Sequence, residues 1–183
     1  MILNKVSSVP VPLDLDEVKR HLRVDHNEDD ERIIKLMAAA CEVAENYTNT
    51  VLIESVYELK LPAFMAEIIL PVFPVLSIDS IDYIDSSGNS QPQATWYLKN
   101  NRFCPVLVPA YNESWPNTQQ GYESVTITLT AGYSALPEQV EHAILMIIGT
   151  LFETDQDIVI GTIVSSVPMS SQTLLDAFKV IRV

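Results

Sequence analysis

The chain has 183 residues, of which 24 are acidic and 11 are basic, so its formal net charge is −13 at pH 7. This charge disfavours a reader of duplex DNA, because affinity for the phosphate backbone comes from clustered Lys and Arg. Two cysteines exclude a disulfide framework and a four-ligand zinc site, and the 48% apolar content predicts that a subunit interface buries part of the surface.

Two helices are predicted near the start of the chain. Asp14 stands three residues before Glu17, which is the spacing of a capping box, and this predicts a short helix over about 15–22. The acidic run 25–31 then places negative charge at the start of a second helix, which the helix dipole favours. Apolar residues at helical spacing extend this second helix over about 28–48.

The middle of the chain has the alternation of β-strands. Residues 51–133 predict about six strands, most simply an antiparallel sheet or small sandwich inserted between helices. Ile78 is out of step with the apolar residues that follow it, which indicates a β-bulge. A turn signal at 86–89 predicts a hairpin whose returning strand is 96–98.

The last part of the chain returns to helices. Pro137 suits a first helical turn, and the broad apolar face that follows predicts a central helix over about 137–152, with a short helix over about 172–178. The fold class is therefore α+β: one domain over residues 1–183, a small helical bundle with an inserted antiparallel β lobe. No segment is long and apolar enough to span a bilayer, and no export signal is recognised, so cytoplasmic synthesis is expected.

Candidate catalytic and metal-binding groups are better explained by structural roles. His21 and His26 share no fixed helix face, and the run 25–31 resembles a calcium loop without the glycine of its sharp turn or the final glutamate. Cys41 lies on an apolar helix face, where it is expected to act as a small core residue. The nucleophile elbow and the phosphate-binding glycine loops are absent, so we expect no enzyme, cofactor or metal.

The nearly uncharged segment 158–167 has no evident place inside a closed bundle. It is interpreted as an edge hairpin that pairs with a neighbouring chain, the alternative being a further strand on its own sheet. The residues predicted at this subunit interface are Ile158, Val159, Ile160, Ile163 and Val164.

A series of short segments runs in order through nearly the whole chain. They are 15–25 (LDEVKRHLRVD), 29–31, 38–48 (AAACEVAENYT), 83–85, 108–111 (VPAY), 114–116 (SWP), 131–133 (AGY), Pro137, 143–149 (AILMIIG), 159–161, Pro168 and 174–182 (LLDAFKVIR). Together they resemble the head–tail connector (adaptor) proteins of long-tailed bacteriophages, in the longer form with a β insertion. Where that family usually has an Asn-Arg-Glu-like stretch after the third helix, this chain has 153–157 (ETDQD), without the arginine of an inter-subunit salt bridge.

The resemblance implies a structural virion protein of a tailed phage, without catalysis. It implies a homo-oligomeric ring of about twelve copies, which fits the use of one heterologous interface repeated around an axis. The implied partners are the portal protein above and a tail-side stopper or tail-completion protein below. The implied location is the virion neck, with assembly in the host cytoplasm and without a membrane.

Two hypotheses follow for this ring. Its acidic channel would let genomic DNA pass without specific binding. Its C-terminus would dock on the portal, because the resemblance implies that members of this family use the C-terminus in this way. A short apolar tail is also expected to be exposed and therefore available for such a contact. The docking residues would be Leu174, Leu175, Phe178, Val180, Ile181 and Arg182.

Two other functions stay open at this point. The first is a tail terminator or another neck or tail-completion protein, which would also form a ring but would bind a different protein of the particle. The second is a small cytosolic binding module whose β lobe holds a ligand around Trp96, Tyr97 and Trp115. Such aromatic residues more often fill a core or an interface than a ligand site.

Overall fold

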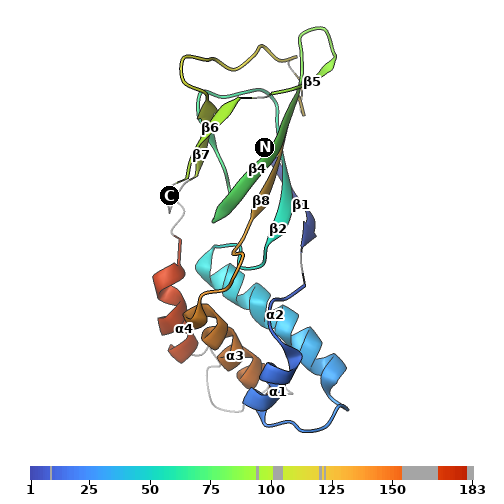
Figure 1. The fold of residues 1–183 in the computed structure, drawn as a ribbon, viewed down its shortest axis with the longest axis vertical. Coiled ribbons are helices and arrows are strands. Elements are labelled where there is room, and N and C mark those ends of the chain that lie inside the picture. Colours follow the sequence, from blue (N-terminus) through green and yellow to red (C-terminus); the bar gives the residue numbers. More distant parts are fainter. Residues whose placement is uncertain are drawn as a thin grey trace, which may run out of the picture. The chain divides into compact units, whose positions relative to one another are not determined.

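The computed structural model describes residues 1–8, 10–93, 95–100, 105–119, 121, 123–153 and 169–180. The chain divides into two compact units. The β unit comprises Met1–Val9, Ile53–Tyr133 and Arg182–Val183, and the helical unit comprises Pro10–Leu52 and Ser134–Ile181. Figure 1 shows that the helices belong to one unit and the strands to the other.

The helical unit is a small bundle in which α2 packs on α3, and α3 packs on α4. Its elements are α1 (Leu15–Leu22), α2 (Asp30–Thr48), α3 (Glu138–Glu153), α4 (Met169–Leu175) and a short 3-10 helix (Asp176–Phe178). Six residues of α3 are buried, from Val140 to Ile148, as expected for the central helix of the bundle. The first three helices lie within two residues of their predicted bounds. The last was predicted at 172–178, but its α-helical part starts at Met169 and the turn 176–178 is 3-10.

Local sequence explains the ends of α1. The Asp14 carboxylate accepts a hydrogen bond from the N–H of Asp16 at 3.4 Å, which satisfies one free donor of the first turn. Arg23 ends the helix in the left-handed conformation, with φ of 59°, and the Val24 N–H donates to the carbonyl of Lys19.

The β unit contains two antiparallel sheets. The five-stranded sheet has the order β1 (Ile2–Ser8), β2 (Ser55–Leu61), β8 (Val125–Ala131), β4 (Val75–Ile84) and β5 (Ser90–Pro92). The three-stranded sheet has the order β3 (Ile68–Ile69), β7 (Val106–Pro109) and β6 (Trp96–Lys99). Figure 1 shows β1, β2, β8 and β4 side by side in this unit.

Alternating residues build the core of the β unit. In β2 and β8 every second side chain is buried, such as Leu59 and Ile127, because successive residues of a strand point to opposite faces. The side chains between them are only partly covered, and all except Val56 are polar, among them Glu58 and Thr128. The three-stranded sheet adds Ile68 and Leu107 to the buried set.

The predicted bulge in β4 is confirmed. The register of β4 against β8 shifts twice, between Val75 and Ser77 and again between Ile78 and Ser80. The turn at 86–89 is also present, since the Gly88 N–H donates to the Asp85 carbonyl at 3.0 Å and Gly88 has a φ of 85°.

The predicted returning strand of this hairpin was wrong. The strand that pairs with β4 after the turn is β5, and 96–98 lies in β6, which pairs with β7 in the other sheet. Pro92 stands at the end of β5 and has no N–H to donate to a ladder, and one further backbone hydrogen bond, from the Gln93 N–H to the Ile81 carbonyl at 2.7 Å, follows it.

The α+β class, with a helical bundle and antiparallel sheets, is confirmed by the structure. The β lobe differs from the prediction in one respect, because β1 at the start of the chain joins it as an edge strand. The chain contains two compact units, and this division does not test whether they form one domain. The single domain over residues 1–183 therefore stays a prediction. None of the helices in the described ranges has the length and apolar character that crossing a membrane requires.

Candidate functional site

The predicted subunit interface lies outside the described residues. This applies to Ile158, Val159, Ile160, Ile163 and Val164, so their role at an interface stays a prediction. The described candidates are therefore the C-terminal segment of the helical unit and the exposed surfaces of the β unit.

The C-terminal segment is held against the end of α2 by side chains. The Tyr47 hydroxyl donates a hydrogen bond to the Asp176 carboxylate at 2.6 Å. The Lys179 ammonium lies 4.5 Å from the centre of the Tyr47 ring, within the range of a cation–π contact. The hydrogen bond to Asp176 is the main cause that raises the pKa of Tyr47, because it stabilises the neutral phenol beside a carboxylate.

Backbone groups complete this attachment at Val180. The Val180 N–H donates to the Thr48 carbonyl at 2.8 Å, and the Val180 carbonyl accepts from the Asn49 side-chain amide at 3.1 Å. Asn49 ends α2 in the left-handed conformation, with φ of 55°, and this directs its side chain to a segment 131 residues away.

The expected exposure of the docking residues is wrong for two of them. Leu175 is fully buried and Val180 is 3% exposed, because both pack inside the helical unit. Leu174 and Phe178 are half-buried and keep part of their surface accessible. Ile181 and Arg182 lie outside the described residues.

The histidines and the acidic run do not form a metal site. His26 Nε2 lies 3.9 Å from the Asp29 carboxylate, and within the described ranges no group of three potential ligands is gathered. Asp30 has a different role that the sequence did not predict. Its carboxylate accepts from the Lys19 ammonium at 2.7 Å, and the same ammonium donates to Asn27 at 2.7 Å, which joins α1 to the start of α2.

Cys41 is a buried core residue, as predicted. Burial, with a smaller contribution from Glu45 and Glu42, raises the pKa of its thiol to about 12. The thiolate is the nucleophilic form of cysteine, so this side chain is unreactive at neutral pH.

The three aromatic residues of the binding-module hypothesis belong to two different segments of the β unit, β6 and the stretch after β7. Trp115 stacks on Phe64, with ring centres 4.6 Å apart, and Phe64 meets Tyr83 edge to face at 5.7 Å. Trp96 and Tyr97 are consecutive residues of β6, where alternate side chains point to opposite faces, and Tyr97 is 60% exposed. Trp115 thus belongs to a small aromatic cluster, whereas Trp96 and Tyr97 are part of the three-stranded sheet.

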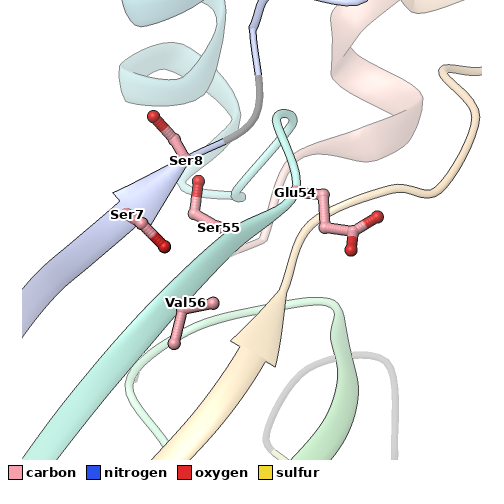
Figure 2. A pocket seen from close by; sticks show the side chains of 5 residues that line it. All are labelled: Ser7, Ser8, Glu54, Ser55 and Val56. Carbon is pink, nitrogen blue, oxygen red and sulfur yellow. The ribbon is translucent and has the colours of Figure 1, made fainter.

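A small hollow of about 120 Å³ lies in the β unit between the end of β1 and the start of β2. Ser7, Ser8, Glu54, Ser55 and Val56 line it, and Figure 2 shows the Glu54 carboxylate pointing away from the serine hydroxyls. The lining side chains therefore do not converge on one point, and the hollow lacks the polar arrangement of a ligand site.

β1 is a strand that the sequence does not predict. All seven of its residues are exposed, and it forms one edge of the five-stranded sheet. The signal that was available is the run Ile2, Leu3 and Val6 in a segment with Lys5 as its one charged side chain.

Comparisons with known proteins connect these surfaces to a family. Residues 12–73 match the family model of phage gp6-like head-tail connector proteins. This match covers α1, α2 and the first strands that follow them, whereas the predicted resemblance extends over nearly the whole chain. No curated protein sequence matches the chain.

Solved structures match the whole chain. A subunit in the neck of an empty GTA particle, computed with C6 symmetry, has a TM-score of 0.82 and 27% identity. A subunit in the virion of a native gene transfer agent (GTA) particle has a TM-score of 0.82 and 26% identity. A subunit in the neck of a native GTA particle, computed with C12 symmetry, has a TM-score of 0.79 and 26% identity. Each match covers 100% of this chain and 97% of the other chain.

The resemblance inferred from sequence is thus confirmed by the family model over residues 12–73 and by the fold over the full length. The chain therefore resembles head–tail connector proteins over residues 12–73 and has the fold of a neck subunit over its full length, which supports a structural role in a particle neck.

Proposed function

We propose that this chain forms a ring of about twelve copies that joins the portal of a tailed phage-like particle to a tail-side stopper or completion protein. The observation that carries this proposal is the match of the full chain to subunits of particle necks, one of them computed with C12 symmetry. The protein is a structural component of the virion neck, assembled in the host cytoplasm, and it carries out no catalysis.

The charge distribution supports a channel for DNA. The helical unit has 16 acidic and six basic residues, and the β unit has eight acidic and five basic residues. A ring repeats this excess of negative charge in every copy, which repels phosphates and lets DNA pass without a specific contact.

The C-terminus is proposed to contact the portal through the surface that remains accessible. Leu174 and Phe178 are half-buried at the end of the helical unit, and the chain continues beyond Val180. A deletion from Leu174 onward is a poor test, because it also removes the buried Leu175 and Val180. Deletion of 181–183, and the substitution Phe178→Asp in the full chain, leave the buried residues in place.

Co-purification tests the proposed function and its main alternative. The tagged protein is mixed separately with portal rings and with tail tubes from the same genome, and bound protein is quantified. We expect stable capture by the portal, and a large loss of capture after Phe178→Asp or deletion of 181–183. Capture by the tail tube alone would support a tail-terminator role and contradict the connector position.

The fold of each variant is the control for this experiment. Circular dichroism is expected to give the same spectrum for the wild type and both variants, since neither change removes a buried side chain among the described residues. Unchanged capture of both variants by the portal would exclude the C-terminus as the docking element and leave the connector role intact.

A further inference from the structure

β1 is an edge strand that the rest of the described chain leaves uncovered. It pairs with β2 on one side, and in the described ranges no strand pairs with it on the other. Ile2 is 47% exposed and Val6 is 63% exposed. Natural proteins protect such edges with charge, proline or a covering element, because an open apolar edge is a template for pairing with another chain.

The opposite side of the same sheet has a second opening. β5 pairs only with Asp82–Ile84 of β4, so residues 76–80 have no described strand on the side away from β8. Two hydrogen bonds bracket this stretch, from the Gln93 N–H to the Ile81 carbonyl and from the Asn100 side chain to the Val75 carbonyl. Leu76 lies within it and is 44% exposed.

The directions of the two edges are compatible with a ring. β1, β2, β8 and β4 pair antiparallel in that order, so β1 and β4 run in opposite directions. Rotation about an axis along the strands preserves strand direction, and it therefore brings β1 of one copy antiparallel to β4 of the next. A ring needs two different patches that fit each other, and these two edges are such a pair.

The charges of the two edges are complementary. Lys5 has no anionic partner among the described residues, and β1 contains no acidic residue. Asp79 accepts hydrogen bonds from Ser77 and Thr130 hydroxyls, and no cation in the described part of the chain pairs with it. β1 therefore has a net charge of +1 from Lys5, and residues 76–80 have a net charge of −1 from Asp79. The two side chains lie on opposite faces of the sheet, so they form no direct ion pair, but the opposite charges of the two edges favour the association of unlike edges over like ones.

We propose that β1 of each copy pairs with residues 76–80 of β4 in the next copy, so that the sheet continues around the ring. The inference rests on the proposed ring function and names a second copy of this chain as the occupant of both edges. The regular part of β1 before its bulge, from Ile2 to Lys5, fits the length of the opening. Four strands per copy at about 4.8 Å spacing let twelve copies close at a radius of roughly 37 Å.

The sheet register identifies residues for a cross-linking test. Asn4 lies opposite Glu58, Glu58 lies opposite Thr128, and Thr128 lies opposite Ser80, so all four share one face of the sheet. Leu3 lies opposite Leu59 on the other face. A disulfide requires Cα atoms within about 7 Å and side chains that point together, so it distinguishes the two faces.

The test uses portal-bound rings that contain two variants, each with one introduced cysteine, in a Cys104→Ser background in which the remaining Cys41 is buried. Asn4→Cys is mixed with Ser80→Cys, or with Ser77→Cys to cover a shifted register, and oxidised samples are run on a non-reducing gel. We expect a covalent dimer from one of these mixtures and at least tenfold less dimer when Leu3→Cys replaces Asn4→Cys. Rings without a dimer from either mixture, or with equal dimer from Leu3→Cys, would overturn the pairing.

A charge reversal gives an independent readout. Lys5→Glu is expected to raise several-fold the protein concentration needed for half-maximal ring assembly on the portal, measured by mass photometry. Lys35→Glu is the matched control, because Lys35 is also exposed but lies in the helical unit, and it is expected to assemble like the wild type. Equal assembly of the Lys5→Glu and Lys35→Glu variants would contradict the role of β1.

Failure of this inference is distinguishable from failure of the proposed function. Wild-type rings on the portal without the predicted cross-link would refute the strand pairing alone. An absence of wild-type rings on the portal would refute the connector role and the pairing together. A cross-link from Asn4→Cys to the portal subunit would assign β1 to the portal and overturn the pairing between copies.

Discussion

The two units of the chain differ in net charge and in how completely their apolar side chains are buried. The helical unit has a net charge of −10 and closes its apolar residues inside a bundle around α3. The β unit has a net charge of −3, and among the described residues no strand pairs with the outer edge of β1, which has apolar side chains. The difference suggests a division of labour, in which the helical unit supplies the acidic surface and the β unit supplies edges for assembly.

The largest expected effect concerns the closed core of the helical unit. Ile144 is fully buried in α3, and Ile144→Ala is expected to lower the free energy of unfolding by about 2–5 kcal/mol, because it removes apolar contacts and leaves a cavity. Chemical denaturation followed by circular dichroism at 222 nm measures this loss.

The control is Ile34→Ala in α2, where the side chain is 53% exposed and the expected change is below about 0.5 kcal/mol. Both tryptophans lie in the β unit, so their fluorescence reports whether that unit unfolds in the same transition. A shared shift would support the single domain predicted from the sequence. A loss below about 1 kcal/mol for Ile144→Ala would contradict the packing around α3.

The next effect concerns the buried lysine that joins two helices. Lys19→Met is expected to destabilise the helical unit by about 1.5–3 kcal/mol, because Asp30 and Asn27 lose a charged hydrogen-bond donor. Lys35→Met, at an exposed position in α2, is the matched control and should change stability little. Equal effects of the two substitutions would show that the Lys19 contacts contribute nothing to stability.

Much of the fold could be predicted from the sequence, because local signals determine it. Asp14 and Pro137 mark helix starts through their capping chemistry, and Ile78 breaks the alternation of β4 where the bulge occurs. β1 gave no such signal, since none of its side chains is buried and alternation therefore carries no information.

The candidate site was less predictable, because it depends on contacts between distant segments. Leu175 and Val180 look like an exposed apolar tail in sequence, but hydrogen bonds to the end of α2 turn this segment into part of the helical unit. Asn49, which makes one of these bonds, has no local feature that indicates a partner 131 residues later. The predicted interface residues within 158–164 lie outside the described ranges and stay a prediction.

A smaller effect tests the chemical inertness of the helical core. In a Cys104→Ser background, Cys41 is expected to react with a thiol reagent at pH 8 roughly a thousandfold more slowly than a thiol with the ordinary pKa of 9.0. The reaction is followed by absorbance, with unfolded protein in denaturant as the reference. Fast labelling of the folded protein would contradict the burial of Cys41.

The smallest effect concerns the turn after β4. The N–H of Asn89 is the main cause that lowers the pKa of Asp85, with a further contribution from the N–H of Ser87. Because the folded pKa is lowered, this carboxylate stabilises the turn at neutral pH, and the contribution is lost as pH falls through the folded pKa. NMR titration of the Asp85 carboxyl should give a pKa below the ordinary 3.8, and a value at or above 3.8 would contradict these hydrogen bonds.

The central claim is that this chain is a ring-forming connector of the neck. It is tested most directly by cryo-electron microscopy of the protein mixed with portal rings from the same genome. We expect a closed collar on the tail-facing end of the portal, with about twelve copies and with β strands continuing from one copy to the next. A portal ring without added density, beside protein that stays monomeric, would contradict it.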